Sequence, residues 1–268
     1  MTLTMIFGLT GLSQEPASSG PDELSARLNH PGDDSLTVKT HYPRLGIFPP
    51  PTIFDPYEFM DRAILVLRHP MNCLPSYHNQ RYEITTGIPS HTTRATVPEW
   101  IAWRDSNFDY EMARWVEHTT FWLDRYSEPG PYGNVFLSIY EGITDDVEGP
   151  GHAQALAEFL DAGENVHALT DEHDVKCSWY KILKDKSSGT HRAGPKYRPY
   201  TPSQLDTMSK SLMWLRDRYE DQPIGAKIVP VLNTYLDMVE EKRYEERPEP
   251  ATLAIGRKRK VQYRAGTN

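Results

Sequence analysis

Two residues, Arg68 and Ser76, have types and a spacing that suit anion binding. The apolar run AILVL ends just before Arg68 and is typical of a strand covered on both faces, as in a parallel sheet. A His-Pro pair then ends the strand, and Pro75 fits the first turn of a following helix. This order predicts Arg68 at the carboxyl end of a strand and Ser76 near the amino terminus of a helix. Open α/β sheets bind anions at such places.

A second feature suited to binding is the basic, glycine-containing segment 184–202. The chain as a whole has a net charge of -8, which argues against a general nucleic-acid binder. A phosphate-bearing ligand would therefore need a local basic cluster, and this segment supplies one. The alternative interpretation is an ordinary solvated loop. Its basic residues are Lys184, Lys186, Arg192, Lys196 and Arg198.

Length and composition limit the function classes. A chain of 268 residues with 38% apolar content can bury a substantial core, which predicts one domain with appended ends. Cys73 and Cys177 are the only cysteines, so we expect no disulfide framework and a reducing compartment. The ten histidines show no HExxH-like spacing, so no metal site is expected. The opening MTLTMIFGLTGL has no basic region and is too short to span a bilayer, so no membrane segment is predicted.

Periodicity predicts alternating strands and helices over most of the chain. Residues 1–34 are expected to be irregular, 35–246 to form the domain and 247–268 to form a flexible basic tail. This order predicts an α/β fold with a mainly parallel sheet flanked by helices. The predicted strands are 35–39, 63–67 and 135–140, and the predicted helices are 76–83, 97–126, 151–163 with Gly163 as C-cap, 201–219 and 231–246.

An aromatic stripe lies along the helix predicted over residues 97–126. Such a stripe is most often part of a core or a wall. The alternative is that one tryptophan lines a hydrophobic pocket for an acceptor substrate. Its members are Trp100, Trp103, Trp115, Phe121 and Trp122.

Four segments, in this order, resemble successive signatures of the sulfotransferases that use 3'-phosphoadenosine-5'-phosphosulfate (PAPS). The closest resemblance is to the branch found in WSC-domain sulfotransferase-like proteins, and it covers roughly residues 35–235. The segments are KTHYP at 39–43, LVLRHPMNCLPSYHNQ at 65–80, LSIYEGITDD at 137–146, and CSWYKILKDKSSGTHRAGPKYRPYTP at 177–202.

The resemblance implies a P-loop-NTPase-like sulfotransferase fold and transfer of a sulfonate group from PAPS to a hydroxyl of a small-molecule or carbohydrate acceptor. Arg68 and Ser76 have the family's eight-residue spacing and would hold the 3'-phosphate, for which a guanidinium and a hydroxyl are suitable donors. His41 would be the general base, because a neutral imidazole accepts a proton near neutral pH. Taken singly, Arg68 would be an ordinary strand-end ion-pair partner and His41 a loop histidine.

Three further roles follow from the resemblance. Lys39, two residues before His41 on an extended strand, would share its face and stabilise charge on the transferring group. Tyr140 would lie against the adenine or its ribose, and Arg192 would help to hold the 3'-phosphate. Their structural alternatives are a solvated lysine, a packed tyrosine and a loop arginine.

One departure from the family is expected to matter. No basic, glycine-containing loop for the 5'-phosphosulfate precedes Lys39, and FGLTGLSQ lacks both a basic residue and the family's Thr-Trp pair. The chain thus resembles a member without its first βα unit.

A second hypothesis is therefore a catalytically inactive relative that acts as a nucleotide-binding or protein-interaction module. A P-loop kinase or NTPase is disfavoured because GxxxxGK[ST] is absent. The chain as it stands is predicted to be cytoplasmic, whereas a lost N-terminal anchor would imply a Golgi or membrane-anchored location.

Overall fold

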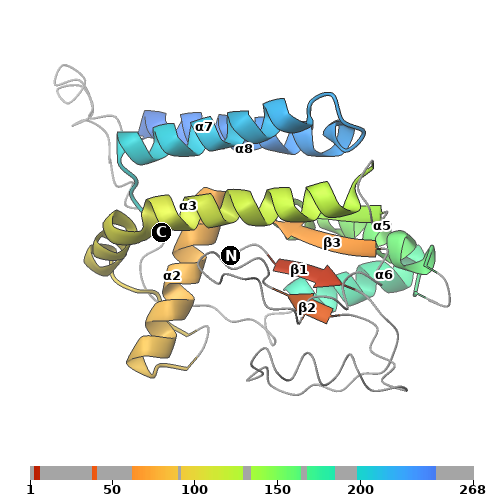
Figure 1. Ribbon diagram of the computed structural model, residues 1–268. Coiled ribbons are helices and arrows are strands. Elements are labelled where there is room, and N and C mark those ends of the chain that lie inside the picture. The colour runs from red at the N-terminus through yellow and green to blue at the C-terminus, as the bar shows by residue number, and fades with distance from the viewer. Residues whose placement is uncertain are drawn as a thin grey trace, which may run out of the picture.

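The structure is a computed structural model that describes residues 3–6, 38–40, 62–89, 92–128, 134–163, 168–184 and 198–245. Strands and helices follow one another in the order drawn in Figure 1. They are β1 (Leu3–Ile6), β2 (Val38–Thr40), β3 (Arg62–Leu67), α2 (Pro70–Thr86), α3 (Val97–Tyr126), β4 (Asn134–Ile139), α4 (Tyr140–Ile143), α5 (Gly149–Asp161), α6 (Glu172–Trp179), the π-helical turn η2 (Tyr180–Lys184), α7 (Pro202–Tyr219) and α8 (Gly225–Glu245).

The described strands form one sheet in the order β2-β1-β3-β4. β3 and β4 are parallel, with Leu67 opposite Ile139, so the expected combination of helices with a parallel strand pair is confirmed. The expectation of a mainly parallel sheet is wrong for the described strands, because β1 is antiparallel to both β2 and β3. A short apolar segment such as LTMI satisfies its backbone hydrogen bonds in either direction, and its sequence therefore does not reveal its orientation.

β1 also corrects the expectation that residues 1–34 are wholly irregular. Leu3–Ile6 forms a strand beside β3. The remaining residues of that segment, and those of the predicted tail 247–268, lie outside the described residues.

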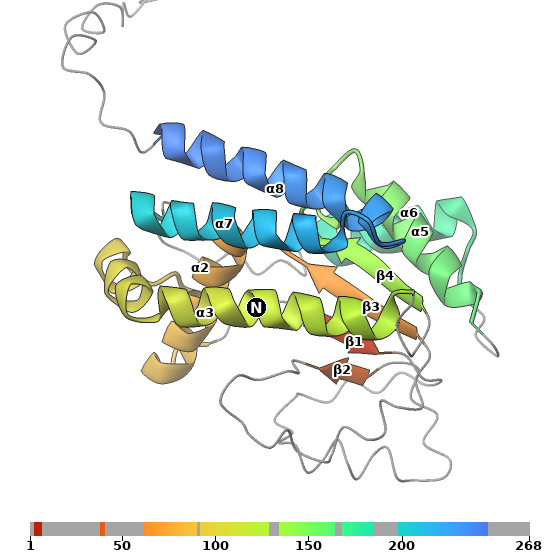
Figure 2. The same cartoon turned by 45° about the horizontal axis from the view of Figure 1, so that its top comes forward.

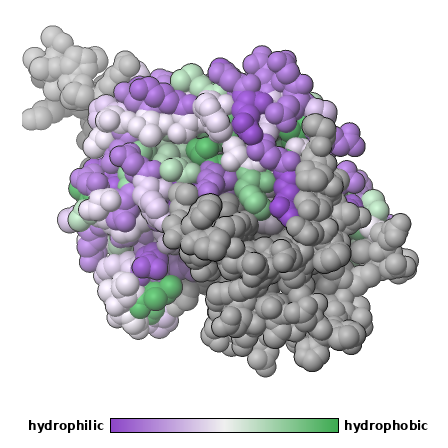
Figure 3. Space-filling model, in the orientation of Figure 1, coloured by the Kyte–Doolittle hydropathy of each residue, from purple (hydrophilic) through white to green (hydrophobic). Residues whose placement is uncertain are grey.

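Helices cover both faces of the β3–β4 pair. Side chains alternate between the faces of a strand, and Leu65 and Leu67 belong to the same buried cluster as residues of α3, α7 and α8. On the other face, the Phe136 ring of β4 lies 5.2 Å from the Phe159 ring of α5. Figures 1 and 2 show the α7–α8 hairpin stacked on α3, which itself crosses the sheet. The outer surface along this hairpin is mainly hydrophilic (Figure 3).

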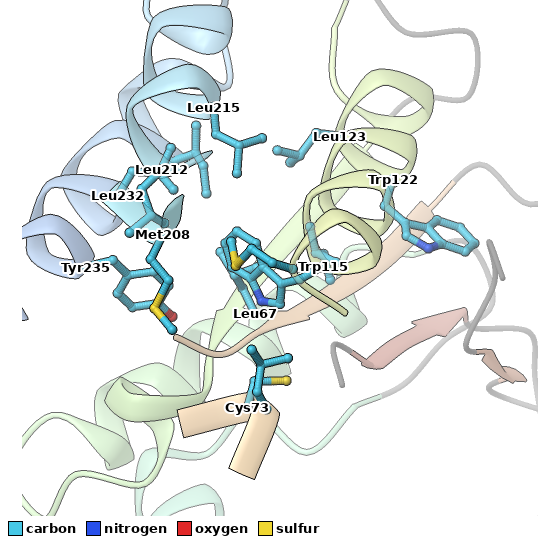
Figure 4. Packing of buried hydrophobic residues seen from close by; sticks show 14 of the residues in the cluster. Leu67, Cys73, Trp115, Trp122, Leu123, Met208, Leu212, Leu215, Leu232 and Tyr235 are labelled. Atoms are coloured by element: carbon cyan, nitrogen blue, oxygen red, sulfur yellow. The ribbon is translucent and has the colours of Figure 1, made fainter. Parts of the chain in front are cut away.

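The aromatic stripe of α3 is core, as its most frequent interpretation predicted. Trp100 and Trp122 are fully buried, and Trp115 is 3% exposed. Figure 4 shows Trp115 beside Leu67 at the end of β3, with Tyr235 of α8 nearby. Complete burial of such a side chain contributes roughly 3 kcal/mol or more to folding. These rings stabilise the layers around the end of β3.

Helix α2 begins at Pro70, six residues before Ser76, where the sequence predicted its start. Pro70, and not Pro75, occupies the first turn, and His69 is the N-cap. Pro75 lies inside the helix, where it lacks the N–H that would bond to the carbonyl of Met71. The hydroxyl of Tyr200 donates to that carbonyl at 3.0 Å instead. A tertiary contact thus allows a proline in the helix interior.

Helix α8 begins at Gly225 and contains Pro230, so the prediction of a helix that starts at residue 231 is wrong. The starts of α3 and α7 follow local sequence signals. Thr201 and Gln204 form a capping box at the start of α7, and α3 has the same arrangement at Thr96 and Glu99. Gly163 is not the C-cap of α5, because Ala162 takes that place.

Candidate anion-binding site

Arg68 and Tyr140 meet at the carboxyl ends of two neighbouring parallel strands. Leu67 and Ile139 are the last paired residues of β3 and β4, so the two residues that follow them leave the sheet side by side. The guanidinium carbon of Arg68 lies 4.2 Å from the centroid of the Tyr140 ring, within the range of a cation–π interaction. The structure therefore brings together two of the residues that the sequence singled out.

The guanidinium of Arg68 has hydrogen-bonding capacity that the described residues leave unused. Its Nε atom is buried and has no hydrogen-bond partner, and within the described ranges the group makes no hydrogen bond or ion pair. A buried donor without a partner costs about 1–3 kcal/mol. An anionic ligand on Arg68 would remove this cost, so the residue fits the phosphate-binding role that the resemblance implies.

The start of helix α2 does not offer free backbone donors to an anion. The N–H of Met71 donates to Nδ1 of His69 at 2.9 Å, and the N–H groups of Asn72 and Cys73 both donate to the His69 carbonyl. The N–H of His69 itself donates to Oε1 of Glu141 at 3.1 Å. Any anion at this edge would depend on side chains, which corrects the expectation of a helix-start anion site.

Ser76 lies farther from the helix start than expected. It is half-buried in the second turn of α2, about 9 Å along the helix axis from Pro70. No hydrogen bond joins it to Arg68 in the described part of the chain. The structure thus shows no hydrogen bond between the two residues of the predicted Arg68–Ser76 pair.

A buried polar network lies behind Arg68, and the sequence analysis assigned it no function. Oε1 of Glu141 accepts the His69 N–H and the Asn72 side-chain amide, and Oε2 accepts the Tyr235 hydroxyl at 3.0 Å. Nε2 of His69 bonds to the Tyr235 carbonyl at 2.9 Å. Because Nδ1 of His69 accepts from Met71, Nε2 carries the proton and the ring is neutral. The local signal that could have pointed to Glu141 is its position directly after Tyr140.

Burial sets the protonation of this network. Desolvation lowers the pKa of His69 to about 4, against a smaller opposing effect of its hydrogen bond to Tyr235. Burial, with the adjacent Glu141 carboxylate, raises the pKa of the Tyr235 phenol well above its usual range. Both groups remain neutral hydrogen-bonding partners at neutral pH.

Two residues of the predicted basic cluster bind to the protein itself. Arg198 is 8% exposed, and its Nη2 donates to the Ala95 carbonyl at 2.9 Å and to Oδ1 of Asn79 at 3.3 Å. Lys184 bonds to the Thr144 carbonyl and forms an ion pair of 2.7 Å with Asp146. These two cations therefore have structural partners, and the cluster is smaller than predicted.

The other three basic residues of the segment, Lys186, Arg192 and Lys196, lie outside the described residues. The described residues on either side of them are attached near the site. Lys184 bonds to the carbonyl of Thr144, which directly follows α4 and so lies shortly after the end of β4. The Tyr200 hydroxyl bonds to the first turn of α2, which follows the end of β3.

Lys39 lies in β2, two strands away from β3. β1 is antiparallel to both neighbours, so β2 runs in the same direction as β3 and its carboxyl end points to the same edge. Lys39 pairs with Met5, which pairs with Ile64. Ideal strand geometry then places the backbone of Lys39 about 10 Å from Arg68 across the strands and about 13 Å from it along the strand direction. His41 lies outside the described residues.

Gly142 stands where the resemblance would place an aspartate. A Cβ atom at this position would lie 2.4 Å from Nε2 of His152. A side chain fits there only if the imidazole of His152, which is partly exposed, moves aside.

One group of potential metal ligands occurs in the described ranges. Asp171, His173 and Asp174 have ligand atoms within 4.8 Å of one another at the start of α6. All three are exposed, and such groups are common without an ion. They carry no argument about function.

Comparisons with protein-family models, with curated proteins and with solved structures found no match. None of the described helices is long and apolar enough to cross a membrane.

Proposed function

We propose that this protein binds the 3'-phosphate of PAPS at the carboxyl ends of β3 and β4 and transfers its sulfonate group to a hydroxyl acceptor. The observation that carries the proposal is the half-buried Arg68, whose guanidinium lies over Tyr140 and whose buried Nε has no hydrogen-bond partner. The resemblance of the motifs around both residues supports the choice of nucleotide. A P-loop-NTPase-like sulfotransferase fold is part of the same proposal.

The proposed roles divide between binding and chemistry. Arg68, with Ser76 and Arg192, would hold the 3'-phosphate, and the Tyr140 ring, which is 38% exposed, would contact the adenosine. Charge-assisted bonds from a guanidinium to a phosphate are strong and directional. Binding at this position would orient the sulfonate, and orientation is the main contribution to such in-line transfers.

In the transfer step, His41 would take the proton from the acceptor hydroxyl while its oxygen forms a bond to sulfur. The bond between sulfur and the 5'-phosphate oxygen breaks, and 3',5'-ADP (PAP) leaves with the electron pair. Lys39 would stabilise negative charge on the transferring group or on the leaving oxygen. The parallel directions of β2 and β3 support this assignment, because both strands end toward the same edge of the sheet.

A second candidate is a catalytically inactive protein that retains nucleotide binding. The orientation of β1 favours this alternative. Ile6, at the carboxyl end of β1, pairs with Ala63 near the start of β3, so the chain leaves β1 at the edge opposite to Arg68. A loop that directly follows β1 therefore starts away from the proposed site, unlike a 5'-phosphosulfate loop at strand carboxyl ends.

Calorimetric titration with PAP and with 5'-AMP tests the proposal. We expect PAP to bind more tightly than 5'-AMP, and Arg68→Ala to weaken PAP binding about 100-fold with little effect on 5'-AMP. Arg218→Ala is the matched control, since Arg218 also lies over an aromatic ring, 5.6 Å from Trp214, but on α7 outside the site.

The outcomes separate the two candidates. Failure of the folded wild-type protein to bind PAP, or equal binding by Arg68→Ala, would overturn the proposed site. PAP binding without sulfonate transfer from PAPS to a panel of hydroxyl acceptors would favour the inactive nucleotide-binding protein. Transfer that is lost in His41→Ala, with PAP binding retained, would support the enzyme.

A further inference from the structure

The peptide group between Arg68 and His69 is held on both sides by side chains from other elements. Its carbonyl accepts the indole N–H of Trp115 at 3.0 Å, and its N–H donates to Oε1 of Glu141 at 3.1 Å. A peptide group fixed at both its polar atoms cannot rotate without breaking one of these bonds. Its orientation determines where the side chain of Arg68 leaves the strand.

The first two residues of α4, which directly follow β4, support Arg68 at two points. Tyr140 lies under the guanidinium, and Glu141 holds the following backbone N–H. The same carboxylate binds the side chain of Asn72 in the first turn of α2 at 3.3 Å. Glu141 therefore links the start of α4 to both the end of β3 and the start of α2.

Glu141 is in turn fixed by helix α8. The buried Tyr235 hydroxyl donates to Oε2 of Glu141, and the Tyr235 carbonyl bonds to the His69 ring. The His69 and Tyr235 rings also make an edge contact with centroids 4.6 Å apart. Glu141, His69 and Tyr235 form a closed ring of contacts in which each member limits the movement of the other two.

We propose that Glu141 is a positioning residue that holds the Arg68 guanidinium in the orientation that receives the 3'-phosphate. This inference rests on the proposed function and adds to it the residue that sets its geometry. Glu141 does not contact the nucleotide in this arrangement. It acts through the Arg68–His69 peptide and the start of α2.

Binding preference provides a test that a purely structural role would not affect. We expect Glu141→Ala to reduce the preference for PAP over 5'-AMP about tenfold, because a small misplacement of a binding group has effects of this size or larger. Glu141→Gln should restore most of the preference, since its amide oxygen can still accept the His69 N–H.

Glu99→Ala is the matched control. Glu99 also accepts a backbone N–H, that of Thr96 at 2.7 Å, but at the start of α3. Glu99→Ala should lower stability without changing the preference for PAP. An unchanged preference in folded Glu141→Ala, or an equal loss in Glu99→Ala, would overturn the positioning role.

A second readout separates this inference from the proposed function. The Nε–H signal of Arg68, assigned by its disappearance in Arg68→Lys, reports the guanidinium environment in NMR spectra without any nucleotide. We expect Glu141→Ala to shift or broaden this signal and Glu99→Ala to leave it unchanged. A wild-type protein that fails to bind PAP would remove the proposed function, while this signal would still decide whether Glu141 positions Arg68. An unchanged signal in Glu141→Ala would reject the positioning role.

Discussion

Two arginines of this protein lie next to buried histidines, and their surroundings differ. Arg198 is 8% exposed and donates to a backbone carbonyl and an amide oxygen. Arg68 is half-buried and lies over Tyr140, and its guanidinium makes no hydrogen bond or ion pair with the described residues. Both belong to segments that the sequence marked as basic or anion-binding. The partners of each guanidinium, and not its charge, distinguish a structural cation from a candidate binding group.

The adjacent histidines show a related contrast. His69 has partners at both ring nitrogens, Met71 and Tyr235. His78 stacks on Trp103 with ring centroids 5.0 Å apart, and its buried Nδ1 has no hydrogen-bond partner. Desolvation, followed by the charge of Arg198, lowers the pKa of His78 to about 4. His69 is held by hydrogen bonds and His78 by ring packing.

The largest expected effect is a difference in stability between variants of the two arginines. Arg198→Ala should lower the free energy of unfolding by about 4 kcal/mol, because two hydrogen bonds are lost and the buried Ala95 carbonyl loses a donor. Arg68→Ala should change it by less than about 1 kcal/mol, because the described residues form no hydrogen bond with the Arg68 guanidinium. Urea unfolding of both variants measures the difference. Equal losses would remove the distinction drawn between the two arginines.

The pH dependence of stability tests the two histidines. A buried histidine with a lowered pKa resists protonation in the folded state, so its stabilising effect is complete above about pH 6.5 and declines as the pH falls toward 4. For His69, a pKa of about 4 in place of 6.5 corresponds to about 3 kcal/mol across this range. His78 contributes with the same sign.

Urea unfolding between pH 7 and 4 measures how steeply the free energy of unfolding of each variant changes with pH. His69→Gln removes one titrating group while keeping polar atoms at the N-cap, and His78→Phe removes the other while keeping the aromatic stack. Each variant should have a shallower pH dependence than the wild type. A slope unchanged in His69→Gln would contradict a neutral, buried His69.

Two tryptophans allow a comparison at the level of single hydrogen bonds. The Trp115 indole donates to the Arg68 carbonyl, whereas the Trp100 indole donates to the Pro199 carbonyl, which also accepts from Arg104. Trp115→Phe should cost about 2 kcal/mol, since its acceptor loses an indole donor. The cost of losing the indole hydrogen bond should be smaller in Trp100→Phe, because Arg104 still donates to the Pro199 carbonyl.

The two substitutions should also differ in nucleotide binding. Trp115→Phe should reduce the preference for PAP over 5'-AMP, and Trp100→Phe should leave it unchanged, as titration of both folded variants would show. A reduced preference in both would indicate a general loosening of the core and not a specific effect on Arg68.

The sequence predicted local features well and tertiary partners poorly. The helix over 97–126 has the predicted bounds, because the periodicity of its aromatic stripe is a local signal. The start of α2 was misplaced because Pro70 and Pro75 both fit a first helical turn. The hydroxyl of Tyr200, distant in sequence, satisfies the carbonyl that Pro75 leaves without a donor.

The site shows the same division. The meeting of Arg68 and Tyr140 follows from two strand predictions and the parallel pairing of those strands. The hydrogen bond between Arg198 and Ala95 joins residues far apart along the chain, as does the bond from the His69 N–H to Glu141. No local sequence pattern indicates either of them. The direction of β1 was equally hidden, since a short segment such as LTMI fits a parallel or an antiparallel neighbour.

The smallest expected effect concerns the contact between Arg68 and Tyr140 itself. A partly exposed cation–π pair contributes about 0.5–1 kcal/mol. In a double-mutant cycle with Arg68→Met and Tyr140→Leu, the coupling in the free energy of unfolding should fall in this range. The pair formed by Arg218 and Trp214 serves as the control, and its coupling should be weaker because its separation is 5.6 Å and not 4.2 Å. Zero coupling between Arg68 and Tyr140 would mean that the ring does not support the guanidinium, and Glu141 would then be its main positioning contact from α4.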